Sequence, residues 1–165
     1  MHQFSTAGWE YFFGAIVGAT AALTGLLFVA VSLNLDRILQ GQSFLPRRAA
    51  ESLGILIFVL YSAALVLVPQ SSRLLGVEIL VVVIPFMVAT FRSQLIHLRT
   101  RSDDPLVWFV GRTVTTSICT IPGLFAGISL VAQWGGGIYW LVPCALLGIG
   151  GAVFGAWVLL VEIAR

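Results

Sequence analysis

Long apolar runs separated by short polar segments dominate the chain. Crossing the roughly 30 Å hydrocarbon core of a bilayer takes about 20 helical residues, and five runs approach that length. None of the runs alternates apolar and polar residues as barrel strands do, so the pattern predicts helices. The runs cover residues 12–33, 53–68, 74–91, 114–132 and 138–161.

The polar segments between the runs carry turn and cap signals. Gly41 and Pro46 indicate a helix stop followed by a new start, residues 69–73 a tight hairpin, and residues 133–137 a flexible glycine turn. We therefore expect one transmembrane domain with helices over residues 10–39, 47–68, 73–98, 106–133 and 138–163. Aromatic residues then gather near one boundary, as an interfacial belt would: Trp9, Tyr11, Trp134, Tyr139 and Trp140.

Composition favours an integral membrane protein. Of the 165 residues, 59% are hydrophobic and 10% are charged, and the mean hydropathy is +1.02. Soluble domains carry about 25% charged residues, so this chain lacks the polar surface that water requires. These values exclude a cytosolic enzyme, a disordered tail, a coiled coil and a secreted disulfide scaffold. The sequence predicts an all-α bundle of five transmembrane helices.

The arginines predict the orientation of this bundle. Eight of the nine basic residues lie in the segments after the first and third runs and at the C-terminus, and only Arg73 lies on the opposite side. By the positive-inside rule, we expect the N-terminus outside and the C-terminus in the cytoplasm. The same side chains would attract anionic lipid headgroups, and they do not indicate nucleic acid. They are Arg37, Arg47, Arg48, Arg92, Arg99, Arg101, Arg112 and Arg165.

Three glycine pairs have the four-residue spacing that lets membrane helices approach closely. Two interpretations stay open, namely packing within the bundle and a face that forms a homo-oligomer or docks another membrane protein. The pairs are Gly14 and Gly18, Gly123 and Gly127, and Gly151 and Gly155.

Polar groups inside the runs are few. Glu78 is the one charged residue well within a run; it either reaches the outer interface and pairs there, or forms a proton or cation site. Two rows of hydroxyls either bond to their own helix or line a pore between copies. The first row is Thr20, Thr24 and Ser32, and the second is Thr113, Thr116 and Thr120.

Residue patterns for catalysis are absent from the sequence. His2 and His97 fall on opposite sides of the expected membrane, and no metal-ligand spacing occurs. Cys119 and Cys144 are expected about 10 Å apart along the membrane normal, beyond disulfide reach. The chain also lacks a P-loop and a nucleophile elbow. We expect no enzymatic activity, no metal and no cofactor.

A resemblance rests on the first run and the loop after it. Residues 20–39 (TAALTGLLFVAVSLNLDRIL) and 47–53 (RRAAESL) resemble a group of small bacterial multi-span membrane proteins, some of which are labelled modulators of a membrane-bound AAA protease. The likeness covers about a fifth of the chain and carries over no site residues. It implies an accessory role, and together with the all-arginine composition it favours a bacterial inner membrane.

Two functional hypotheses follow from these patterns. The first is a non-enzymatic accessory or regulatory subunit that acts by helix association through the glycine pairs, with Asn34, Asp36 and Arg37 as a polar cytoplasmic contact. The alternative is a homo-oligomeric channel for ions or small solutes, lined by the hydroxyl rows. A membrane enzyme would require a cofactor in the purified protein.

Overall fold

The computed structural model describes residues 4, 6, 8–40, 45–99 and 106–164. Within these segments, five helices are long and apolar enough to cross a membrane, which confirms the all-helical fold predicted from hydropathy. The long helices are α1 (Glu10–Leu33), α3 (Leu45–Leu67), α4 (Ser72–Arg99), α5 (Leu106–Ala132) and α6 (Leu141–Ala164). A short helix α2 (Leu35–Gln40) precedes α3, and a 3-10 helix η2 (Gly137–Trp140) precedes α6.

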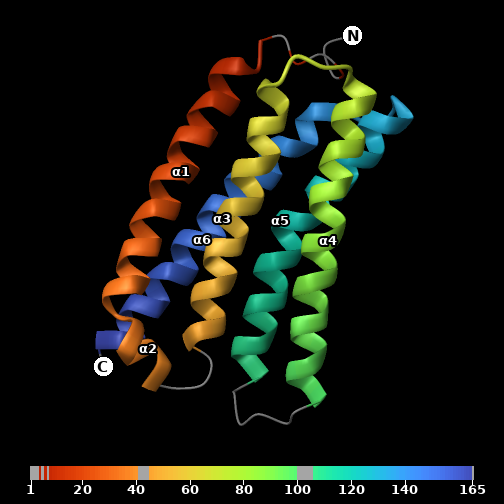
Figure 1. The fold of residues 1–165 in the computed structure, drawn as a ribbon. Helices are drawn as coiled ribbons and strands as arrows, with labels where there is room; N and C mark the ends of the chain where they lie inside the picture. The colour runs from red at the N-terminus through yellow and green to blue at the C-terminus, as the bar shows by residue number, and fades with distance from the viewer. Residues whose placement is uncertain (1–3, 5, 7, 41–44, 100–105, 165) are drawn as a thin grey trace.

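Consecutive long helices run in opposite directions (Figure 1). We call the end at which α1, α4 and α6 begin the upper end, and the end at which α3 and α5 begin the lower end. Helices α3, α4, α5 and α6 form a ring in which each packs on two neighbours, whereas α1 lies outside this ring, mainly against α3. The bundle is thus a four-helix ring with a fifth helix attached to its side.

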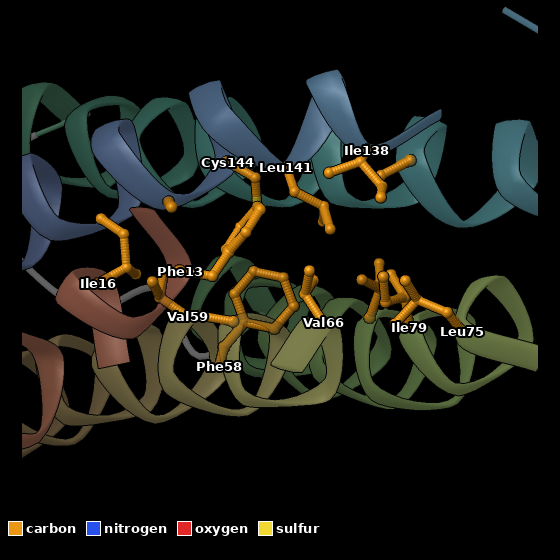
Figure 2. Close-up of a cluster of buried hydrophobic side chains, with 14 of the residues drawn as sticks. Phe13, Ile16, Phe58, Val59, Val66, Leu75, Ile79, Ile138, Leu141 and Cys144 are labelled. Carbon is orange, nitrogen blue, oxygen red and sulfur yellow. The ribbon is translucent and has the colours of Figure 1, made fainter. Parts of the chain in front are cut away.

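An apolar core joins all five long helices. Leu75, Ile79 and Leu130 are fully enclosed in its largest cluster, part of which Figure 2 shows. In the same cluster, Phe58 of α3 stacks on Phe86 of α4, with ring centroids 5.0 Å apart. The buried members of the cluster come from every long helix, so this core holds the bundle together.

Glycines bring α4 and α5 unusually close. A Cβ added to Gly76 would lie 2.8 Å from the Leu130 Cβ and 2.9 Å from the Gly127 carbonyl oxygen. A Cβ added to Gly127 would lie 2.7 Å from Leu80. Small residues on both helices therefore set this contact, as expected where backbones pack closely.

The first predicted span, residues 10–39, is wrong at its end, because the helix breaks at Asn34. The Asn34 amide Nδ2 donates to the Ala30 carbonyl at 2.9 Å, and its backbone N–H bonds to Val31 at 3.2 Å. Helix α2 then starts in a new direction and buries Ile38 against Ala49 and Leu159. Hydropathy alone could not locate this break, since apolar residues continue on both sides of it.

Hydrogen bonds cross the turn over residues 133–137. The Ser129 hydroxyl donates to the Trp134 carbonyl and accepts the Gly137 N–H at 2.7 Å. Gln133 reaches across to Ser72, with Nε2 3.0 Å from Oγ. Positive φ angles at the three glycines, 88°, 111° and 54°, explain why glycine occupies this turn.

Candidate functional site

The glycine pairs of α5 and α6 lie inside the bundle. A Cβ added to Gly123 would stand 3.2 Å from Phe58 Cζ. One added to Gly151 would stand 2.5 Å from Thr115 Cγ2, and one added to Gly155 the same distance from Ser52 Oγ. With Gly127 against α4, all four of these glycines serve helix packing within the chain.

The glycine pair of α1 is different. A Cβ added to Gly14, Gly18 or Gly25 would meet no atom within 4 Å. The interpretation that Gly14 and Gly18 pack within the bundle is therefore wrong. The reason lies in which face of α1 the ring covers: the buried residues of α1 are Phe13, Ile16, Thr20 and Leu27.

The uncovered side of α1 carries two rows of exposed residues, and one of them contains all three open glycines. Counting about 100° per residue, this row points roughly 140° away from the buried residues of the helix. We call it the α1 seam, and it consists of the exposed residues Tyr11, Gly14, Gly18, Ala21, Gly25, Phe28 and Ser32. The other exposed row has the same spacing but ends in larger side chains, and it consists of Ala15, Ala19, Ala22, Leu26, Val29 and Leu33.

The first hydroxyl row does not form one face. Thr20 is buried against the ring, and its Oγ1 donates to the Ile16 carbonyl at 2.6 Å. Thr24 donates to the Thr20 carbonyl at 2.6 Å, whereas Ser32 is exposed on the α1 seam. The two threonines therefore satisfy their own helix.

The second hydroxyl row lies within the bundle. Thr116 and Thr120 are buried, and Thr120 Oγ1 donates to the Thr116 carbonyl at 2.8 Å. Thr113 is half-buried near the lower end. None of the three offers an exposed hydroxyl face to a second copy.

Glu78 lies in the second turn of α4, close to the hairpin between α3 and α4. It is half-buried, and its Oε2 accepts a hydrogen bond from Gln70 Nε2 at 2.7 Å. The same amide nitrogen donates to the Leu65 carbonyl at 3.1 Å. The carboxylate thus faces the upper end and ties the turn after α3 to the first turns of α4.

The three residues expected at the lower surface have separate roles. Asn34 caps α1 through its bond to Ala30. Asp36 and Arg37 are exposed on α2, which follows the break at the end of α1. They place two charged groups at the lower end of the bundle.

The sequence interpretation missed several buried polar side chains. Ser52, Ser62, Gln94 and Ser129 are at most 7% exposed. Ser129 could have been suspected, because it precedes a glycine turn. Ser62 lies among apolar residues, and the residues next to Ser52 and Gln94 give no signal of burial.

Groups suited to metal binding are not found in the described segments, where no three His, Cys, Asp or Glu residues come together. Cys119 and Cys144 are both buried and free. His2 and Arg101 lie outside the described residues, as does Arg165. Comparison of the chain with protein-family models, with curated proteins and with solved structures finds no match in any of the three.

Proposed function

We propose that the chain is a multi-pass protein of the bacterial inner membrane, with its upper end outside and its lower end in the cytoplasm. The charges support this orientation, because Arg37, Arg47 and Arg92 are exposed toward the lower end, whereas Arg73 stands at the start of α4. The exposed Trp134 suits the opposite interface. The lower arginines would then meet anionic lipid headgroups.

We infer that the protein acts by association, as a non-enzymatic accessory or regulatory subunit of a membrane complex. The α1 seam is the docking surface, and its occupant is a helix of another membrane protein of that complex. Asp36 and Arg37 would add a polar contact at the lower end.

The absence of neighbours around the α1 glycines carries this proposal. A glycine inside a helix destabilises it by about 1 kcal/mol relative to alanine. Close packing against another helix offsets this loss in membrane bundles, and every glycine of the α5 and α6 pairs lies against atoms of another helix. Gly14, Gly18 and Gly25 meet no such atoms within the chain, and these three recur on one helix, whereas Gly150 of α6 is open alone. A partner helix would supply the missing contact.

The shape of the seam fits one helix of a partner. Glycine and alanine occupy its middle, and Tyr11 and Phe28, 93% and 62% exposed, flank it. Glycines four residues apart, such as Gly14 and Gly18, let a partner backbone approach closely. Two large side chains around a flat centre would fix the register of the partner helix.

Leucine substitutions on two different uncovered glycines test this proposal. Gly18→Leu fills the seam, whereas Gly150→Leu adds the same side chain on α6, where a Cβ also meets nothing within 4 Å. We expect Gly18→Leu to shift the complex extracted in mild detergent to the mass of the single chain. Light scattering of the purified complex measures this shift.

Gly150→Leu is the matched control, because it should leave both the fold and the complex unchanged. Gly151→Leu is unsuitable, since it would collide with Thr115. Complexes of equal mass for the wild type and the Gly18→Leu variant would contradict the proposal.

The hydrogen bonds of the described hydroxyls do not favour the channel alternative. The hydroxyls of Thr20, Thr24 and Thr120 donate to carbonyls of their own helices, which is a structural use of these groups. The resemblance to labelled modulators of an AAA protease stays a prediction, and it agrees with an accessory role.

A further inference from the structure

A small cavity lies where α1, α3 and α6 meet. It leaves about 10 Å³ for the centre of a water molecule, which is close to the least room that holds one water. Its lining includes Phe13, Val59, Ser62, Ala63, Leu141 and Cys144. Figure 2 shows Phe13 from α1 directed toward Cys144 of α6, with Val59 of α3 on the other side.

One polar atom in this lining is buried without a partner. Ser62 is 4% exposed, and its Oγ has no hydrogen-bond partner among the described residues. Other hydroxyls in apolar parts of the bundle bond to their own helix, as Thr20 and Thr90 do. A buried hydroxyl left unpaired is costly, so native structures supply it with protein or water.

We propose that this cavity binds one water molecule through the Ser62 hydroxyl. The water exchanges a hydrogen bond with Ser62 Oγ and turns a second hydrogen toward the Cys144 sulfur, a weak acceptor. The apolar side chains of Phe13 and Leu141 close the remaining sides.

The position of the cavity makes this water accessible. Ser62 lies five residues before the end of α3, which is about 7.5 Å along the helix from the upper end. Water from the upper end would cross only this outermost part of the span, which covers residues 46–67. The site does not depend on association through the α1 seam, because it lies on the opposite, buried side of α1.

Radiolytic labelling of the purified chain tests the proposal directly. A brief X-ray exposure forms hydroxyl radicals from bound water, and these oxidise the side chains beside it. Cys144 lines the cavity, whereas Cys119 is buried to 0% exposure and is not part of its lining. We expect several-fold more oxidation of Cys144 than of Cys119, measured by mass spectrometry of peptides.

Ser62→Ala supplies the second measurement. It should lower Cys144 oxidation to the level of Cys119, and it should lower the Tm by about 2–4 °C through the loss of one water-mediated hydrogen bond. Equal oxidation of the two cysteines in the wild type would overturn the proposal. A Tm raised by Ser62→Ala would overturn it as well, because removal of an unpaired hydroxyl stabilises a core.

Discussion

Gly76 and Gly127 set the distance between α4 and α5, and each lies against backbone or Cβ atoms of the opposite helix. Gly150 is also a glycine, but it lies on an uncovered part of α6. What a glycine does in this bundle therefore depends on what stands opposite its missing side chain.

Alanine at Gly76 should destabilise the protein, whereas alanine at Gly150 should not. The added methyl group would be forced within 3 Å of Leu130 and of the Gly127 carbonyl, and overpacking of this kind costs about 1–3 kcal/mol. Gly150→Ala meets nothing within 4 Å and improves helix propensity by up to about 1 kcal/mol. Thermal unfolding in detergent measures both, and equal Tm values would contradict the α4–α5 contact.

At this scale the sequence indicated which residues could form close helix contacts, but it did not predict which of these contacts form. Gly14 and Gly18 have the same spacing as Gly123 and Gly127, yet only the second pair is covered. Spacing reports that a close approach is feasible, but the side that faces the ring is decided by tertiary packing. Glu78 shows the same limit, because its partner Gln70 comes from the adjacent turn.

Helix α2 shows how a short element can be fixed by one side chain. Ile38 is 1% exposed and sits between Ala49 of α3 and Leu159 of α6. Its neighbour Leu39 is 63% exposed. The short helix is thus anchored on one side and open on the other.

Serine at position 38 should release α2 from the bundle. Truncation of a buried isoleucine costs about 2–5 kcal/mol of stability. A helix of six residues is not stable by itself and depends on such packing. We expect trypsin to cleave the Ile38→Ser variant faster than the wild type after Arg37. Gel electrophoresis of the detergent-purified protein at successive times measures this cleavage. Leu39→Ser is the control and should be cleaved at the wild-type rate; if both variants behave alike, Ile38 is not the anchor.

At the scale of elements, hydropathy and length predicted the five long helices, because the runs match the thickness of a bilayer. The break at Asn34 and the 3-10 helix before α6 escaped prediction. Both depend on specific hydrogen bonds, from Asn34 to Ala30 and around Ser129, within segments whose hydropathy does not change.

The whole molecule is asymmetric in how its helices are covered. The described glycines of the ring α3–α6 lie against another helix, with the exception of Gly150. Helix α1 packs mainly on α3 and has the smallest buried share of the five long helices. In a bilayer the exposed side of α1 would face lipid or a partner. The open glycines of the α1 seam favour a partner helix.

Photo-cross-linking in intact cells tests this central claim most directly. A photoreactive phenylalanine analogue would replace Phe28 of the α1 seam, or Phe154 of α6 as a matched site, since the two are 62% and 60% exposed. The account predicts a protein adduct at position 28 that disappears in the Gly18→Leu background, and no adduct at position 154. Adducts of equal yield at both positions, or an adduct at position 28 that survives Gly18→Leu, would contradict it.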